Sequence, residues 1–346
     1  MPTVETQFAN LASKIERVLP DLNPDTNLSD PIFELIPIVT EDTHLVDYTI
    51  RDNSKGLQGG TALEGKPAYV SRLTDSLFRV VPGVFRDVAD IAETEITELR
   101  DMASREQFQK IEARITDIAN LLAERENSRI KKNIWTTMVS GTQNITDALG
   151  NVVSNFKYAR NYSTAGVAWS STASAKPLYD MRALFAGING RTSSAFGPKA
   201  KAFANSVTIN HMLNNSNAVD LGGKFAGGGN TAFNSLDDAN RFYAGDGLPQ
   251  FVRYDEGYYD DDGTWQKFLA DGYVVFVGAR PGNSQIGKYV MTRNAVNPNA
   301  APGQYFKMYG PDELAVKIPP KYEIHRGHNG CPVFHYPSAI RIMYVL

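Results

Sequence analysis

The chain has 346 residues, of which 42% are hydrophobic, so it can bury a core as one large domain or two linked ones. Its 35 basic and 38 acidic residues give a formal net charge of -3, without the basic excess of a tight nucleic-acid-binding domain. The single cysteine, Cys331, excludes an intramolecular disulfide and a multi-cysteine metal cluster. No secretory signal or run of about 18 apolar residues is found, so we expect a protein made in the cytosol and not exported.

The first segment, residues 1–43, is expected to be an extended arm. It joins a short amphipathic piece to a stretch rich in Pro, Asp and Asn. The piece Ile32–Val39 is too apolar to lie in water. Its cover is either the chain's own core or a neighbouring subunit, and in the second case Phe33 and Ile36 are candidate inter-subunit contacts.

A long hairpin is predicted over residues 44–83. Leu45–Ile50 and Ala68–Phe78 both alternate between apolar and polar residues, as half-buried strands do. The segment between them contains four glycines within 55–67, which predict a mobile tip. Because a two-stranded hairpin is marginal alone, its side chains are candidates for contact with another subunit. These candidate residues are Lys55, Leu57, Leu63 and Lys66.

Two helices are predicted next. Val84–Met102 is interpreted as the first, from the spacing of its apolar residues. Ser104 is a possible N-cap, with Gln107 three residues later, for a second helix over about 105–138. Its apolar stripe predicts packing against a sheet rather than a coiled coil. The stripe comprises Phe108, Ile111, Ile115, Ile118 and Leu122, and resumes at Ile130 and Ile134.

A weak basic cluster lies on this second helix. Three interpretations remain open: a solvated face, contact with packaged DNA, or contact with an acidic neighbour. The cluster comprises Arg125, Arg129, Lys131 and Lys132.

Shorter elements follow toward the C-terminus. The predicted elements are a strand in Asn151–Tyr162, a helix opened by Pro177, a strand and short helix in Ala200–Asn214, a helix capped by Ser235, and a closing strand in Ala339–Leu346. We expect the closing strand to join elements formed much earlier in the chain.

The segment Phe251–Asn283 predicts strands around a turn at Asp260–Gly263, followed by a buried strand at Val274–Val277. Its acids suggest either paired carboxylates or a solvated turn, and the turn is favoured because the order of an EF-hand calcium loop is absent. These acids are Asp255, Glu256, Asp260, Asp261 and Asp262.

Metal ligands are suggested only by His325, His328 and Cys331. The glycines and Pro332 around them indicate a loop without the second ligand pair of a structural zinc site. Phosphate-binding loops and nucleophile elbows are also missing. We therefore expect no metal, no cofactor and no catalytic residue.

The order Arg-Tyr, Tyr, Asp-Asp-Gly, Phe-Leu-x-Asp-Gly, Val-Val-x-Val within Phe251–Asn283 resembles the lambda-like E family of tailed-phage major capsid proteins. The resemblance implies an α+β, HK97-like capsid fold with an N-terminal arm, an E-loop hairpin, a long spine helix, a peripheral domain and an inserted axial domain. The implied boundaries are arm 1–43, E-loop hairpin 44–83, peripheral domain 84–180 with the spine helix at about 105–138, axial domain 181–305, and closing peripheral strands 306–346.

The same resemblance implies self-assembly. Copies of the chain would form pentamers and hexamers of an icosahedral phage head around double-stranded DNA, which they would contact non-specifically. Other implied partners are a scaffolding protein, a portal and a decoration protein, with no membrane involved. The resemblance further implies that the chain is made in the cytoplasm of the host bacterium and ends in the capsid of the virion.

Two other functions remain open at this stage. An encapsulin-like compartment shell would share the fold and would co-purify with an enzyme instead of DNA. A soluble enzyme using the acids between Asp255 and Asp262 would be a monomer or small oligomer.

Overall fold

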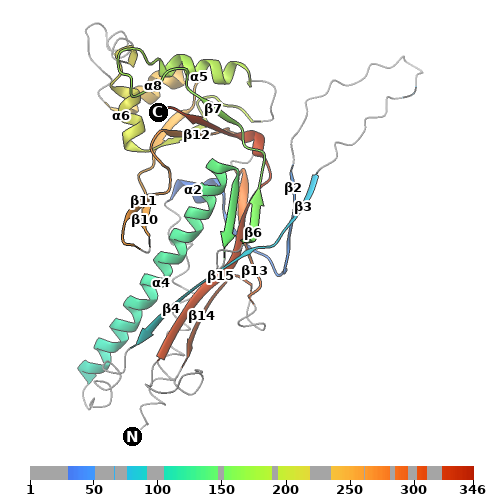
Figure 1. Ribbon diagram of the computed structural model, residues 1–346, viewed down its shortest axis with the longest axis vertical. Helices are drawn as coiled ribbons and strands as arrows, with labels where there is room; N and C mark the ends of the chain where they lie inside the picture. The colour runs from blue at the N-terminus through green and yellow to red at the C-terminus, as the bar shows by residue number, and fades with distance from the viewer. Residues whose placement is uncertain are drawn as a thin grey trace.

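The computed structural model places one long helix across a sheet, with a second sheet and shorter helices at one end of it (Figure 1). We call the first sheet the lower sheet and the second the upper sheet, as drawn. The structure describes residues 30–50, 66, 76–91, 105–146, 152–188, 194–218, 235–260, 262–280, 285–294, 302–309 and 322–346.

The lower sheet is organised around one long central strand. It contains β1 (Ile38–Thr40), β4 (Gly83–Ile91), β13 (Gly287–Thr292), β14 (Gln304–Tyr309) and β15 (Tyr322–Phe334). β15 pairs antiparallel with β4, β13 and β14, and β1 is parallel to β13. The sheet therefore brings together strands from both ends of the described chain.

The long helix α4 (Arg105–Ser140) confirms the helix predicted over 105–138. Its 36 residues span roughly 54 Å at 1.5 Å per residue. It ends at Gly141, which adopts a φ of 72° that other residues rarely adopt. Its buried hydrophobic residues are Ile115, Ala119, Leu122, Ile130, Ile134, Trp135 and Met138.

The upper sheet contains the closing strand in its interior. Its order is β7 (Tyr162–Thr164), β16 (Ile340–Tyr344), β12 (Tyr273–Val277), β8 (Lys201–Ala204) and β9 (Gln250–Arg253). The closing strand thus pairs with strands made much earlier, as predicted. The sheets do not follow the expected boundary at 305/306, because β13 lies in the lower sheet and β16 in the upper one.

The helices at the upper sheet confirm the predicted starts at Pro177 and Ser235, and a third helix is capped by Asn205, which was not predicted as a cap. α5 (Pro177–Ala186) starts with proline, and α6 (Ser206–Leu213) and α8 (Leu236–Gly245) are capped by the side chains of Asn205 and Ser235. Their apolar faces form a core with Phe196, Phe251, Val274 and Phe276 of the upper unit.

A separate core joins two units, which we call the lower unit (the lower sheet with α4) and the upper unit (the upper sheet with α5, α6 and α8). Its buried residues come from α2 (Pro31–Leu35), α4, both sheets and the 3₁₀ turn η3 (Pro337–Ala339). Representative members are Ile32, Trp135, Phe203, Tyr289 and Ile340. Side chains from both sheets therefore pack in one continuous apolar cluster, which fixes the two units relative to each other.

Within the described residues, three further pairs of strands form separate two-stranded sheets. β2 (Val46–Ile50) pairs with β3 (Ser76–Val80), β5 (Thr142–Thr146) with β6 (Val152–Lys157), and β10 (Gly257–Tyr259) with β11 (Trp265–Lys267). The predicted hairpins around residue 60 and around Asp260–Gly263 are thereby confirmed at their paired strands.

The predicted helix at Val84–Met102 is wrong over its described part, because residues 83–91 form β4. Val84 and Val88 are four residues apart, a spacing that places them on one face of a helix and equally on one face of a strand. Pairing with β15 over the whole length of β4 decides for the strand. Residues 92–102 lie outside the described residues.

Candidate assembly interface

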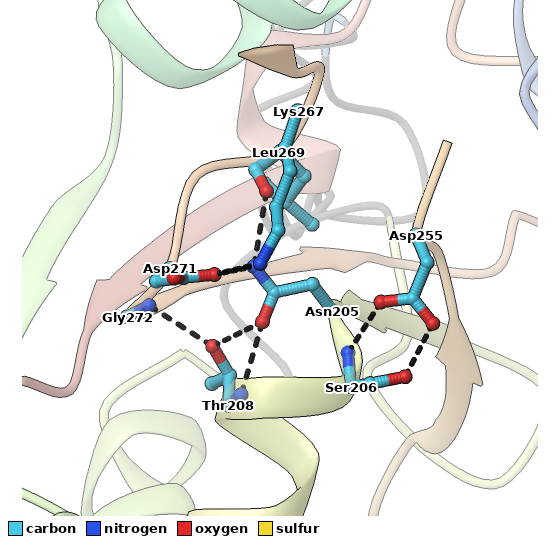
Figure 2. Close-up of polar contacts among 8 residues, drawn as sticks. All are labelled: Asn205, Ser206, Thr208, Asp255, Lys267, Leu269, Asp271 and Gly272. Carbon is cyan, nitrogen blue, oxygen red and sulfur yellow. Dashed lines mark hydrogen bonds and ion pairs between the residues drawn. The ribbon is translucent and has the colours of Figure 1, made fainter. Parts of the chain in front are cut away.

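Asp255 is the first of the acids that suggested a catalytic site. Its carboxylate accepts hydrogen bonds from the Ser206 backbone N–H at 2.7 Å and from the Ser206 hydroxyl, at the start of α6 (Figure 2). Burial alone would raise the pKa of Asp255, but these bonds outweigh it and lower the pKa. The carboxylate is therefore ionised at neutral pH and holds the start of a helix.

Asn205 beside it is the centre of a buried polar cluster (Figure 2). Its Oδ1 accepts from the backbone N–H and the hydroxyl of Thr208, at 2.9 and 2.8 Å. Its Nδ2 donates to the Leu269 carbonyl at 3.1 Å and to Asp271 Oδ1 at 2.6 Å. One side chain thus caps α6 and ties it to the segment that leads into β12.

Asn205→Ala is expected to lower the free energy of unfolding by about 2 kcal/mol, because it removes a helix cap and leaves buried groups without partners. Ser235→Ala is the matched control, since Ser235 caps α8 from an exposed position. It should cost about 1 kcal/mol or less. Urea unfolding of the unassembled subunit measures both, and equal losses would contradict the role of the Asn205 cluster.

The remaining described acids also support structure. Asp260 Oδ1 accepts from the Thr264 backbone N–H at 2.8 Å, and Oδ2 accepts from Gln266 Nε2 at 3.1 Å. These bonds, the Thr264 one first, lower the pKa of Asp260. Asp262 is exposed and Asp261 lies outside the described residues. The acids therefore close a turn and do not converge on one reacting centre.

Glu256, the last of these acids, takes part in an ion-pair joint between the two units. Lys131 of α4 lies 2.8 Å from Asp30 and 2.5 Å from Glu256, and Asp30 also accepts from the Tyr254 hydroxyl at 3.0 Å. Burial alone would lower the pKa of Lys131, but its two carboxylate partners outweigh it and raise the pKa. Asp30 additionally caps α2 through the Ile32 N–H.

The other three residues of the predicted basic cluster also contact their own chain. Arg125 lies 2.8 Å from Asp87, the Arg129 guanidinium lies 5.5 Å from the centre of the Phe85 ring, and Lys132 lies 4.4 Å from that of Tyr258. Together with Lys131, these side chains attach α4 to β4 and to the β10–β11 hairpin. Arg125 and Arg129 are exposed, as expected for a solvated face, whereas Lys131 is buried in contacts within its own chain.

The histidine cluster lies on strand β15, which corrects its interpretation as a loop. Residues three apart on a strand point to opposite faces, so His325 and His328 do not converge. His325 contacts Glu323 at 2.9 Å, and burial raises the pKa of the Cys331 thiol to about 12. Among the described residues, no group of three or more His, Cys, Asp or Glu could hold a metal ion.

His328 instead belongs to a buried network between α4 and the lower sheet. Glu126 Oε2 accepts from Arg326 Nε at 2.6 Å, and Glu126 Oε1 lies 2.9 Å from His328 Nδ1. The Tyr289 hydroxyl lies 2.9 Å from His328 Nε2 and accepts from Asn133 Nδ2 at 3.2 Å. The network therefore crosses from α4 through β15 to β13.

Electrostatics favour the ionised form of Glu126. Burial alone would raise its pKa, but His328 and Arg326 outweigh this effect and lower the pKa. The sequence contains one signal for this network. Glu126 lies four residues after Leu122 and four before Ile130, so a carboxylate occupies a position of the apolar stripe.

The candidate inter-subunit residues have separate places in the structure. Phe33 and Ile36 are buried in the core of their own chain. Of the two possibilities left open by the sequence, packing on the chain's own core is the one found for these residues. Lys66 is exposed. Lys55, Leu57 and Leu63 lie outside the described residues and remain a prediction.

A surface suited to assembly runs along β3 and β4, which we call the β3–β4 ribbon. The chain passes from β3 of the hairpin to β4 of the lower sheet (Figure 1), and several apolar side chains along this stretch are exposed. Exposed apolar side chains that gather on one surface are a common feature of protein–protein contacts. The exposed apolar residues of the ribbon are Leu77, Phe78, Val81, Val84 and Val88.

Comparison with known proteins gives one family match. A family model described as phage major capsid protein E matches residues 40–335. No curated protein sequence matches significantly. The described part of the chain contains no helix with the length and apolar character needed to span a membrane.

Several solved structures are similar to this one. A protein assigned as the capsid protein of a prophage of Escherichia coli CFT073 is 16% identical, with a TM-score of 0.50 over 79% of this chain and 80% of that chain. A phage-related protein from Bordetella bronchiseptica RB50 is 8% identical, with a TM-score of 0.47 over 90% of each chain. The mature capsid of bacteriophage PhiM1 is 9% identical, with a TM-score of 0.48 over 90% of this chain and 85% of that chain. The similarity in fold is therefore drawn from the prophage capsid protein, whose TM-score is 0.50.

Proposed function

The chain belongs to the phage major capsid protein E family, and from this premise we propose how its subunits contact one another in the head. A major capsid protein is a structural protein of the icosahedral shell, so its place is the virion. Copies of the chain assemble with one another, and the β3–β4 ribbon supplies part of the contact.

The two units correspond in this proposal to the domains expected for the fold. We assign the lower sheet with α4 to the peripheral domain and the upper sheet with α5, α6 and α8 to the axial domain. β2 and β3 form the base of the E-loop, whose tip lies across the adjacent subunit. The joint core and the Lys131 ion pairs support a subunit that enters assembly as one rigid body.

The observation that carries the contact proposal is the exposed apolar row of the ribbon. Leu77, Val84 and Val88 lie on strands that are already paired on one side, and Val81 lies in the connection between those strands, so further burial of these side chains requires another molecule. Many such modest contacts, repeated around a closed shell, supply large total stabilisation. We also propose Lys55, Leu57, Leu63 and Lys66 as contacts with a neighbouring subunit.

Further partners follow from the capsid role. We propose pentamers and hexamers of the chain, a scaffolding protein and a portal during assembly, a decoration protein on the finished shell, and packaged double-stranded DNA. The net charge of -3 supports contact with DNA that is weak and non-specific.

We propose no catalytic role for the acids, because Asp255, Glu256 and Asp260 all hold structural elements. Metal and cofactor sites are likewise not proposed.

Native mass spectrometry of the purified full chain at low micromolar concentration tests the oligomers. The expected result is a set of masses equal to five and six chains, in addition to larger assemblies. Masses limited to one or two chains, with and without a co-expressed scaffolding protein, would contradict the proposed rings.

A further inference from the structure

Two side chains of opposite charge meet in the core that joins the two units. Lys131 Nζ of α4 lies 2.8 Å from Asp30 Oδ2 at the start of α2, and these side chains are only 9% and 2% exposed. Trp135, one turn further along α4, and Tyr254 belong to the same buried core. An amine and a carboxyl group are therefore held in contact and away from water, which gives the pair a high effective concentration.

A second carboxylate touches the same amine from the solvent side. Glu256 Oε2 lies 2.5 Å from Lys131 Nζ, and the Glu256 side chain is 51% exposed. Burial alone would lower the pKa of Lys131, but the two carboxylates raise it, so the resting pair is ionised. Passage of one proton from Nζ to Asp30 turns the buried ions into an uncharged amine and carboxylic acid, which cost less to bury.

The Asp30 carboxyl group is positioned for attack at its carbon. Its Oδ1 accepts from the Ile32 backbone N–H at 2.9 Å, and its Oδ2 accepts from the Tyr254 hydroxyl at 3.0 Å. Fixed donors of this kind stabilise the negative charge that develops on a carboxyl oxygen when an amine attacks. The next residue, Pro31, has no backbone N–H. Asp30 therefore cannot lose water by closing a ring onto that nitrogen, as other aspartates do.

We propose that Lys131 and Asp30 condense into an isopeptide bond within one chain. The Nζ lone pair attacks Asp30 Cγ, Glu256 takes the surplus proton from Nζ and passes it to Oδ2, and Oδ2 leaves as water. One C–N bond forms, one C–O bond breaks, and no oxidant or further reactant is needed. Oδ1 becomes the oxygen of the new amide and keeps its hydrogen bond from the Ile32 N–H.

The bond joins the start of α2 to α4 permanently. An ion pair separates when the chain unfolds, whereas an amide does not. The reaction takes place once in each chain, so it gives the acids no substrate to turn over. The inference goes beyond the proposed function and does not rest on it, since every group belongs to one subunit.

Mass spectrometry of the purified full chain, unfolded just before measurement, tests for the bond. The expected mass is lower than that of the unmodified chain by one molecule of water. Trypsin does not cut after a lysine whose amine is acylated, so residues 18–51 should be recovered joined to residues 130–132. Fragmentation must place the bond on Asp30, because Glu34 and Glu41 lie in the same peptide.

Two substitutions separate this reaction from other losses of water. Lys131→Arg keeps the positive charge but removes the reacting amine, so it should lose no water. Glu256→Gln keeps the contact between Lys131 and Asp30 but removes the proton carrier, so the reaction should slow at least about a hundredfold. Glu34→Gln is the matched control, because Glu34 is also an exposed carboxylate and pairs with Lys201 at 2.6 Å. It should form the bond as the wild type does.

A folded wild-type chain that keeps its full mass after prolonged storage would overturn the proposal. A bond placed on Glu34 or Glu41, or a loss of water that persists in Lys131→Arg, would overturn it as well. The bond and the capsid role fail separately. Normal shells built from chains without the bond refute only the bond, and bonded chains that never assemble refute only the capsid role.

Discussion

Glu126→Ala is expected to lower the free energy of unfolding by about 3–5 kcal/mol. The side chains of Arg326 and Glu126 are 3% and 4% exposed, and their 2.6 Å contact leaves the guanidinium with little access to water. Removal of the carboxylate leaves the buried charge of Arg326 without its ionic partner and also removes the partner of His328. Urea unfolding of the unassembled subunit measures the loss.

Glu124→Ala is the matched control because Glu124 is exposed on the same helix. It should change stability by no more than about 0.5 kcal/mol. Glu126→Gln keeps the shape of the side chain and removes its charge, so it separates packing from electrostatics. A Glu126→Ala loss as small as that of Glu124→Ala would contradict the importance of the network.

The same network predicts a dependence on pH. The folded-state pKa of Glu126 is below its ordinary value of 4.5, so its contribution is present above pH 4.5 and is lost as pH falls through the folded-state value. The stability advantage of the wild type over Glu126→Gln should therefore be constant near neutral pH and shrink below pH 4.5. An advantage that grows on acidification would contradict the assigned direction.

Replacing residues 51–75 with a short turn that joins β2 directly to β3 is expected to abolish shells while the subunit stays folded. The base of the hairpin is held by the stacking of Tyr48 on Phe78 and by the Arg79–Asp47 ion pair, neither of which is touched. The removed segment contains Lys55, Leu57, Leu63 and Lys66, all proposed as contacts with a neighbour. Particle yield should fall at least about tenfold, since each 1.4 kcal/mol of lost contact is tenfold.

Sedimentation gives the particle yield and circular dichroism reports folding. A second variant, with residues 51–75 replaced by Gly and Ser at the same length, distinguishes the loss of side-chain contacts from the loss of reach. It should also fail to form shells. Normal shells from either variant would show that the segment does not hold subunits together.

Local chemistry made much of the fold predictable from the sequence. Ser235 is a side chain that caps a helix, Gly141 adopts a conformation suited to a helix end, and the Asp260–Gly263 turn follows a strong hairpin signal. Each signal acts within a few residues, so it needs no knowledge of the rest of the chain.

Features set by distant pairing were missed. β4 was mistaken for a helix because the spacing of Val84 and Val88 fits both structures, and only β15, more than 200 residues later, decides between them. The loop interpretation of His325–Cys331 failed for the same reason, since Gly327 and Gly330 lie in a strand that is paired on both sides. The burial of Phe33 and Ile36 also depends on elements far along the chain.

Electron cryo-microscopy of particles purified from cells that express the full chain tests the proposed capsid role. The expected result is closed icosahedral shells whose subunits contain the α4 helix across the lower sheet, with the β2–β3 hairpin of each subunit on its neighbour. Uniform particles of one or two chains, under conditions in which the chain is folded and a scaffolding protein is present, would contradict it.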